Sequence, residues 1–419
     1  MCAFAADSPA SSDPVDPPNR VTLADIRAAA ALLDGVIRTT PLAHSRALSD
    51  AVGGRVDLKC ENLQRTGSFK IRGAYVRMHR LPEAARRAGV VAASAGNHAQ
   101  GVALAARLLG MTATVFMPLR AALPKVAATQ GYGAEVKLAG DALEDTLAAA
   151  QQFAEQTGAQ FIHPFDHPDV VAGQGTVGLE IVAQAPDVRT VLVPTGGGGL
   201  TAGVAAAIKA LQPDVRVVAV QAAEMAAWPD SLAQGRPVRT ASRATIADGI
   251  AVAEPGATPF PLIASLVDEV LTVSEDSLSR ALLHCLERAK LVVEPAGAAG
   301  VAALLDRPGA FEPPVVSVLS GGNVDPLLMG HVIRHGMAAG GRYLSAVVRL
   351  VDRPGALAAL LTTVGELGCN VLDVEHSRIS GALAIGEVDV ALKMETRGPR
   401  HRVEVLDALR ASGHRVELD

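Results

Sequence analysis

Short apolar runs rich in valine alternate with longer stretches rich in alanine and leucine from Val56 to about residue 338. Valine favours buried strands, whereas alanine and leucine favour helices. Strands that alternate with helices predict parallel sheets, which bind ligands at the carboxyl ends of their strands. The clearest predicted strands are Val90–Ala93, Thr112–Phe116, Val191–Val193, Val215–Val220 and Val315–Leu319.

Both ends of the chain depart from this pattern. Residues 1–19 have no periodicity and are rich in proline, serine, aspartate and alanine, which predicts a disordered tail. After Gly340-Gly341 the pattern predicts a ferredoxin-like βαββαβ module. Its predicted elements are a strand at 343–351, a helix to about residue 367, strands near 370–376 and 383–393, a helix at about 400–410 and a last strand.

Composition narrows the class of protein. Hydrophobic residues make up 49% of the 419 residues and aromatic residues only 3%, which suits helices packed on parallel strands. A net charge of −5 gives no reason to expect nucleic acid or a membrane surface as a partner. The four cysteines are far apart, without metal-site spacing, and no export signal is visible. We therefore expect a cytoplasmic protein.

Four successive glycines, Gly196–Gly199, follow a predicted strand and precede a predicted helix at 201–210. Amides of such a turn, together with the positive end of the helix dipole, bind anions such as phosphate. No Gly-Lys-Ser/Thr follows, which excludes a Walker loop. A dinucleotide fingerprint is weakly matched, since Gln221 stands near the place of the required acid. A tight turn without a ligand is the other alternative.

Lys70 is the second candidate for chemistry. Ser68 is a plausible N-cap, which places Lys70 in the first turn of a helix, where the dipole favours the neutral amine. Its neighbours Phe69 and Ile71 are apolar, although most lysines are simply solvated. An amine that can form a Schiff base and a loop that can hold a phosphate together predict pyridoxal phosphate.

Two further loops follow predicted strands. Ser94-Ala95-Gly96-Asn97-His98 is an anion site suited to a carboxylate, and Asn97 could also donate to a phenolic oxygen. His98 could be a general base or could make a structural hydrogen bond. Ser320, before Gly321-Gly322-Asn323, could bond a ring nitrogen, although such a sequence is also ordinary turn chemistry.

At this point the motifs resemble those of one family. In order they are Gly67–Ala74, Ser94–Gly101, Gly196–Leu200, Asp248-Gly249, Glu294–Gly297 and Ser320–Asn323. Over roughly residues 22–338 the chain resembles threonine dehydratases (threonine ammonia-lyases), pyridoxal-phosphate enzymes of the tryptophan-synthase-β fold type. The C-terminal module resembles an ACT domain.

The resemblance implies an α/β fold with two open parallel-sheet domains followed by the ACT domain. The large domain would comprise residues 20–62 and 164–338, the small domain 63–163, and the ferredoxin-like βαββαβ ACT domain 341–419.

The resemblance also implies a role for each matched residue. Lys70 would hold the cofactor through a Schiff base and later carry the substrate α-proton, and Phe69 and Asn97 would hold the ring. The phosphate would be bound by Gly196, Gly197, Gly198, Gly199 and Leu200, and Ser320 would face the ring nitrogen. The substrate carboxylate would be bound by Ser94, Ala95, Gly96, Asn97 and His98. An amino-acid effector would be bound by Asp352, Arg353, Pro354, Gly355 and Asn370.

Departures from related enzymes refine the reaction. Serine racemases of this fold type have a second serine where Ala95 stands, so its absence predicts elimination instead of racemisation. Their acidic metal ligands are replaced here by Gln221 and Ala227, with Glu224 the nearest acid, which predicts no divalent metal. A neutral serine at the ring nitrogen makes a weak electron sink, which also favours elimination over transamination.

We therefore predict a pyridoxal-phosphate-dependent threonine dehydratase that forms 2-oxobutanoate and ammonia and also acts on L-serine. We expect a homo-oligomer that is regulated by isoleucine or a similar amino acid at the ACT domain. Three alternatives are a serine-preferring dehydratase, an NAD-dependent oxidoreductase and an amino-acid sensor with an inert α/β body.

Overall fold

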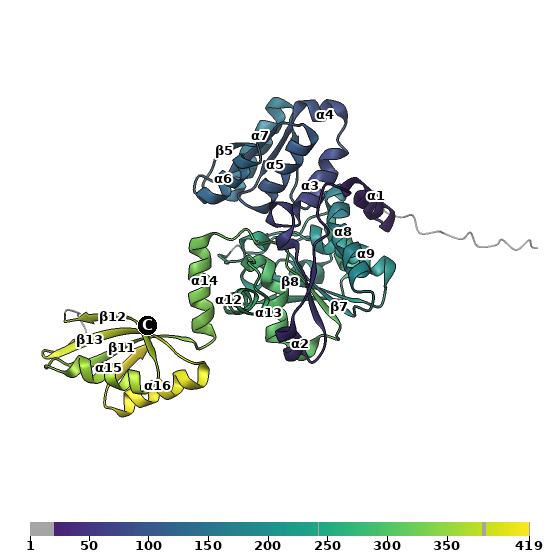
Figure 1. Ribbon diagram of the computed structural model, residues 1–419. Coiled ribbons are helices and arrows are strands. Elements are labelled where there is room, and N and C mark those ends of the chain that lie inside the picture. Colours follow the sequence, from purple (N-terminus) through teal and green to yellow (C-terminus); the bar gives the residue numbers. More distant parts are fainter. Residues whose placement is uncertain (1–20, 242, 379–382, 419) are drawn as a thin grey trace, which may run out of the picture.

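The computed structural model describes residues 21–241, 243–378 and 383–418. Three sheets organise this part of the chain, and each is covered by helices (Figure 1). Two of the sheets are parallel or nearly so, and the C-terminal one is antiparallel. This arrangement confirms the predicted α/β class with a separate C-terminal module.

The six-stranded sheet has the order β1-β2-β10-β7-β8-β9. All neighbours in it are parallel except β1 and β2. Its strands are β1 (Leu42–His44), β2 (Val56–Lys59), β7 (Thr190–Pro194), β8 (Arg216–Ala222), β9 (Glu269–Val273) and β10 (Val315–Val318).

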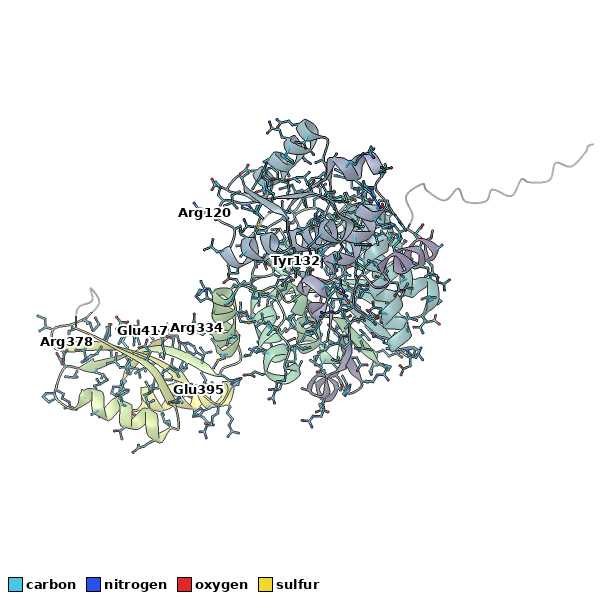
Figure 2. All side chains as sticks on the ribbon, turned by 45° about the horizontal axis from the view of Figure 1, so that its top comes forward. Arg120, Tyr132, Arg334, Arg378, Glu395 and Glu417 are labelled. Carbon is cyan, nitrogen blue, oxygen red and sulfur yellow. The ribbon has the colours of Figure 1, made fainter. Side chains whose placement is uncertain are left out.

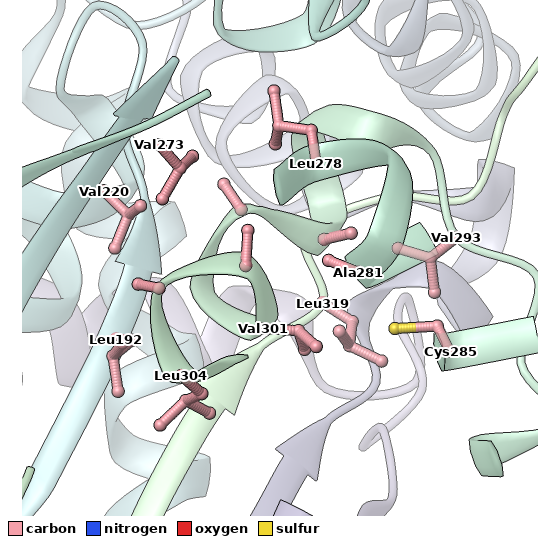
Figure 3. Close-up of a cluster of buried hydrophobic side chains, with 14 of the residues drawn as sticks. Leu192, Val220, Val273, Leu278, Ala281, Cys285, Val293, Val301, Leu304 and Leu319 are labelled. Carbon is pink, nitrogen blue, oxygen red and sulfur yellow. The ribbon is translucent and has the colours of Figure 1, made fainter. Parts of the chain in front are cut away.

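Helices cover both faces of this sheet because its central strands are apolar on both sides. On β7, Val191 and Val193 pack against α8 (Pro168–Gln184) and α9 (Gly199–Leu211). Leu192 faces the opposite side, where Leu278 of α12 (Glu275–His284) and Val301 of α13 (Ala299–Asp306) complete the core (Figure 3). The other helices around this sheet are α1 (Leu23–Leu33), α2 (Arg46–Val52), α10 (Trp228–Gln234) and α11 (Pro259–Leu266).

The four-stranded parallel sheet has the order β5-β4-β3-β6. Its central strands again have two apolar faces, since Val90 packs towards α5 and Val91 packs towards α7. The strands are β3 (Val90–Ala93), β4 (Ala113–Met117), β5 (Glu135–Leu138) and β6 (Gln160–Phe161). The helices are α3 (Lys70–His79), α4 (Glu83–Ala88), α5 (Asn97–Leu109), α6 (Leu123–Gly131) and α7 (Leu143–Thr157).

The C-terminal module has the predicted βαββαβ order. Its elements are β11 (Tyr343–Val351), α15 (Ala356–Glu366), β12 (Asn370–Ser377), β13 (Glu387–Glu395), α16 (Pro399–Ala411) and β14 (Arg415–Leu418). The third strand begins at Glu387, later than the predicted residue 383. Helix α14 (Pro326–Ala339) packs on α12 and leads to the module, which lies apart from the two parallel sheets (Figure 1).

Across residues 21–241, 243–378 and 383–418, no helix is both long enough and apolar enough to cross a membrane. The uncharged stretch from Thr190 into α9 is β7, the glycine loop and the start of that helix.

Candidate active site

A pocket of about 320 Å³ lies where the carboxyl ends of β3, β7 and β10 meet. Loops that follow parallel strands converge at this edge of a sheet. All of the cofactor and substrate residues that the sequence predicts line this pocket. They are Phe69, Lys70, Ser94, Ala95, Gly96, Asn97, His98, Gly196, Gly197, Gly198, Gly199, Leu200 and Ser320.

Lys70 is the first residue of α3, but Ser68 is not the N-cap that the sequence predicts. Phe69 occupies the N-cap position, and Ser68 is extended because its backbone pairs with Gly321 in a short bridge. The Phe69 amide also donates to the Ser320 carbonyl at 3.2 Å. The lysine helix is therefore tied to the loop after β10, two segments far apart in sequence.

The surroundings of Lys70 favour its neutral form. Its Nζ atom donates to the Pro164 carbonyl at 3.0 Å and lies 5.2 Å from the centre of the Phe69 ring. Burial lowers the pKa of Lys70 to about 8, and the nearby charge of Glu294 opposes this change. A larger fraction of the amine is thus unprotonated near neutral pH than for an ordinary lysine.

A buried ionic network fixes α3 two residues after the lysine. Arg72 donates to Glu61 through Nε and Nη2, both at 2.8 Å, and to Glu180 through Nη1 at 2.7 Å. Lys59 Nζ reaches the other oxygen of Glu180 at 2.5 Å. Arg72, Glu61 and Lys59 are fully buried. Such geometry makes α3 a rigid support for Lys70.

The glycine loop leaves its backbone uncovered at the start of α9. Gly198 is the N-cap with φ of 99°, and no side chain caps this helix end. A β-carbon on Gly198 would meet Trp228 at 2.4 Å, and one on Gly197 would meet the Phe165 ring at 2.3 Å. The first amides of a helix lack intrahelical acceptors, so this end is suited to a phosphate.

Replacing Gly198 by alanine should weaken phosphate binding because the loop must shift away from Trp228 and the positive φ becomes strained. We expect the affinity of the apoenzyme for pyridoxal phosphate to fall by at least about 10-fold, equivalent to roughly 1.4 kcal/mol. Spectrophotometric titration measures this affinity. Gly131→Ala is the matched control, since a β-carbon there meets nothing within 4 Å. Equal affinity of G198A and wild type would contradict the assignment.

The Ser94–His98 loop leads directly into α5, which begins at Asn97. His98 Nε2 donates to the Ile162 carbonyl at 2.8 Å. Burial lowers the pKa of His98 to about 3, and the charge of Lys70 lowers it further. A neutral histidine that donates to a backbone carbonyl fits the structural alternative better than a general base.

Sequence reasoning missed two residues that hold Asn97. The Asn97 side chain donates through Nδ2 to Glu294 Oε1 at 2.6 Å and accepts from Asn323 Nδ2 at 2.7 Å. Asn323 Nδ2 also donates to the Thr66 carbonyl at 2.6 Å. Both positions stood in recognised motifs, at Glu294–Gly297 and Ser320–Asn323, but one sequence gives no sign that these segments meet.

Glu294 is 5% exposed and lines the pocket. Burial raises its pKa to about 7, and the charge of Asp248 adds to this rise, whereas the hydrogen bond from Asn97 opposes it. Gly321 is required beside it, because a β-carbon there would meet Glu294 Oε1 at 2.3 Å.

The remaining lining residues include an ion pair and a serine. Lys125 Nζ of α6 lies 2.8 Å from Asp248 Oδ2. This ion pair links a helix of the four-stranded sheet to a loop of the domain with the six-stranded sheet, beside the pocket. Ser320 is buried and lines the pocket at the end of β10.

The positions compared with the racemase metal ligands have structural roles. Gln221 accepts from the Trp228 amide at 3.0 Å and donates to the Met225 carbonyl at 3.4 Å. Glu224 lies 3.6 Å from Arg243. Within the described ranges, no group of three or more His, Cys, Asp or Glu side chains could hold a metal ion.

The predicted regulatory residues do not come together in one chain. Asn370 lies opposite Glu395, which also pairs with Tyr343, at one end of the C-terminal sheet. Asp352–Gly355 follows the other end of β11, and Asp352 is about 30 Å from Tyr343 at 3.3 Å per residue.

The residues of the pocket fit pyridoxal phosphate. The glycine-lined, uncapped start of α9 can receive a phosphate, and the Lys70 amine opens into the same pocket. Ser320 and Asn97 offer the hydrogen-bonding groups that a substituted pyridine ring requires.

Comparison with known proteins agrees with this chemistry. A family model described as pyridoxal-phosphate dependent enzyme matches residues 33–321, and an ACT-domain model matches residues 345–411. The chain therefore belongs to the family of pyridoxal-phosphate-dependent enzymes and carries a C-terminal ACT domain. This confirms the predicted cofactor and family.

Individual relatives are more specific. The L-threonine ammonia-lyase of Thermotoga maritima is 47% identical over 398 residues, covering 95% of this chain and 99% of the relative. The crystal structure of a T.th. threonine deaminase is 43% identical, with a TM-score of 0.69 over 73% of this chain and 99% of that one. Maize serine racemase is 35% identical, with a TM-score of 0.71 over 74% and 96% of the two chains.

Proposed function

We propose that this protein is a threonine ammonia-lyase that converts L-threonine to 2-oxobutanoate and ammonia. The observation that carries the proposal is that the Lys70 amine and the glycine loop open into one pocket. The 47% identity to an L-threonine ammonia-lyase over nearly the whole chain supports the same reaction. Membership of the pyridoxal-phosphate family removes the reason for the NAD-dependent alternative.

The residues that would hold the cofactor follow from the pocket. Pyridoxal phosphate supplies an aldehyde that condenses with amines and a ring that withdraws electrons from the substrate α-carbon. The amides from Gly196 to Leu200 would bind its phosphate, and Lys70 would bind its aldehyde carbon. Asn97 would donate to the ring hydroxyl, and Ser320 would face the ring nitrogen.

Lys70 would also move the proton. With its pKa lowered to about 8, the Lys70 amine would be able to act in its neutral form and take the proton from the α-carbon of bound threonine. The Ser94–His98 loop would bind the substrate carboxylate and so aim the Cα–H bond at Lys70. The β-hydroxyl would leave with a proton as water, and hydrolysis of the released enamine would return this water and give 2-oxobutanoate and ammonia.

Ala95 favours elimination over racemisation. It lines the pocket with a methyl group, which cannot act as an acid. Maize serine racemase has the same overall fold. The choice between elimination and racemisation therefore depends on side chains and not on the architecture. L-Serine carries the same α-proton and β-hydroxyl, and we propose it as a second substrate.

We further propose a homo-oligomer that is regulated by an amino acid at its ACT domain. The edge strand β12 exposes Leu372 and Val374, which suits pairing with a second copy. The free thiols of Cys60 and Cys285 are buried, which suits a reducing cytoplasm.

Purified holoenzyme tests the function. Borohydride should fix the cofactor to Lys70 and bleach the colour of the protein, and L-threonine should yield 2-oxobutanoate. We expect kcat/KM for threonine to exceed that for serine. A protein that stays colourless and unlabelled with added pyridoxal phosphate would overturn the proposal and favour an inert amino-acid sensor. A higher kcat/KM for serine would support the serine-preferring alternative.

A further inference from the structure

A second cavity, of about 430 Å³, lies where the C-terminal module joins the rest of the chain. It is lined by Arg342, Gly368, Asn370, Glu395, Thr396 and Arg397. Figure 2 shows Glu395 at the end of the module near α14, whereas Arg378 lies at the far end. Arg378 pairs with Asp352 at 3.0 Å, so this cavity is distant from the predicted effector loop. Its volume is in the range of sites for small ligands.

Two opposite charges in this cavity have no ionic partner. Elsewhere on the sheet, Lys393 pairs with Asp373, and Arg349 pairs with Asp389. Among the residues that the structure describes, neither Glu395 nor Arg397 forms an ion pair. One free carboxylate and one free guanidinium facing the same cavity match the two charges of an amino-acid zwitterion.

Hydrogen bonds hold together the segments that border this cavity. Gly368 follows the C-cap of α15 with φ of 75°, and a β-carbon there would make an ordinary contact of 3.6 Å with Arg397 Nη2. The Thr396 amide donates to the Arg342 carbonyl at 2.9 Å, and the Thr396 hydroxyl donates to the Gly341 carbonyl at 2.5 Å. These bonds fix Thr396, directly after β13, against the segment that leads into β11.

We propose that this cavity binds a small or polar α-amino acid as an effector of the enzyme. Arg397 and the Asn370 amide bind its carboxylate, and Glu395 binds its ammonium group. None of the six lining residues is apolar, so the cavity does not select a branched aliphatic side chain such as that of isoleucine. This inference rests on the proposed function, whose regulation it specifies.

Arg342 connects the cavity to the catalytic part of the chain. Its Nη1 atom lies 2.6 and 2.9 Å from the two carboxylate oxygens of Glu287. Glu287 belongs to the π-helical turn Cys285–Ala289, and the chain then runs to the active-site residue Glu294. A ligand carboxylate in the cavity competes with Glu287 for Arg342, and this competition alters the segment that carries Glu294.

The test uses full-length holoenzyme and amino acids that lack a β-leaving group. L-Asparagine, L-alanine, L-isoleucine and D-asparagine are titrated by calorimetry, and threonine kinetics are measured with and without each. We expect L-asparagine or L-alanine to bind and to change KM for threonine. Arg397→Gln and Glu395→Gln should each weaken this binding by at least about 10-fold, because each removes a charge-assisted hydrogen bond.

Matched controls separate this site from the rest of the module. Arg400→Gln alters an exposed arginine outside the cavity that pairs with Glu404, and it should bind the effector within about twofold of wild type. Glu287→Gln should retain binding and lose the change in KM. Without effector, all of these variants should keep the wild-type kcat, which tests the proposed function separately.

Three results would overturn the proposal. One is that none of these amino acids binds at about 10 mM, a weaker limit than a typical effector site. Another is that Asp352→Asn abolishes binding while R397Q and E395Q leave it intact, which places the effector at the loop after β11. The third is that L-isoleucine binds more tightly than both L-asparagine and L-alanine.

Discussion

Lys70→Ala holoenzyme is expected to form 2-oxobutanoate from L-threonine at least about 10⁴-fold more slowly than wild type, since it loses both nucleophile and base. The second lysine that lines the pocket, Lys125, cannot replace it, because its amine is held by Asp248 at 2.8 Å. Initial rates measured under saturating threonine give the decrease in kcat. Borohydride treatment should also leave K70A without bound cofactor.

The control for this loss is a lysine far from the pocket. Lys209→Ala removes a partly exposed amine that pairs with Asp268 at 2.9 Å, and its activity should match that of wild type. Circular dichroism of K70A should show the native helix content, because the Arg72 network that anchors α3 remains. Activity of folded K70A within about 10-fold of wild type would contradict the role of Lys70.

Sequence predicted the positions of the pocket because each motif lies directly after a strand. In a parallel α/β sheet the carboxyl ends of the strands share one edge, so Gly196 and Ser320, after β7 and β10, were expected to lie together. Ser94 follows β3 of the other sheet, and the packing of the two sheets brings it to the same pocket. The same logic predicted β3 and β11 with their observed bounds. Local periodicity therefore predicted the fold, and the loop motifs with Lys70 predicted the cofactor.

Contacts between distant segments could not be predicted in this way. Ser68 has the side chain of an N-cap, but pairing with Gly321 holds it in an extended conformation. Glu294 is placed beside Asn97 by the packing of two loops almost two hundred residues apart. Asp352 and Asn370 were grouped by family resemblance, whereas the register of β11 and β13 places them at opposite ends of a sheet. Each difference arises from tertiary pairing that a single sequence does not encode locally.

The hydrogen bonds around Asn97 determine how its amide is oriented. Both hydrogens of Asn323 Nδ2 are used, one by the Thr66 carbonyl and one by Asn97 Oδ1. Asn97 must then direct its own NH₂ group to Glu294, which leaves its second hydrogen for the ring hydroxyl of the cofactor. We infer that Glu294 is a positioning residue for this contact.

Two substitutions of Glu294 should therefore differ in their effects on turnover. Glu294→Ala leaves the partly buried Asn97 NH₂ without its acceptor, a cost of about 1–3 kcal/mol, and kcat should fall by about 10- to 100-fold. Glu294→Gln can still accept from Asn97 through its amide oxygen, and kcat should stay within about threefold of wild type. Steady-state kinetics should show KM for threonine changed less than kcat in both variants, because the Asn97–Glu294 bond orients the ring contact and not the backbone amides of the carboxylate loop. Equal losses of kcat in E294A and E294Q would show that the charge matters and not the hydrogen bond.

The buried Glu294 should also make the stability of the protein depend on pH. Burial raises the pKa of Glu294 from 4.5 to about 7, so between these values the folded protein binds a proton that the unfolded chain has lost. The free energy of unfolding then decreases as pH rises from about 4.5 to 7 and stays reduced above 7. E294Q lacks this ionisation, and its apoenzyme should be more stable than wild type at pH 8 by up to about 3 kcal/mol. Thermal unfolding of both apoenzymes measures the difference, which should disappear near pH 4.5; a constant difference at all pH values would contradict the raised pKa.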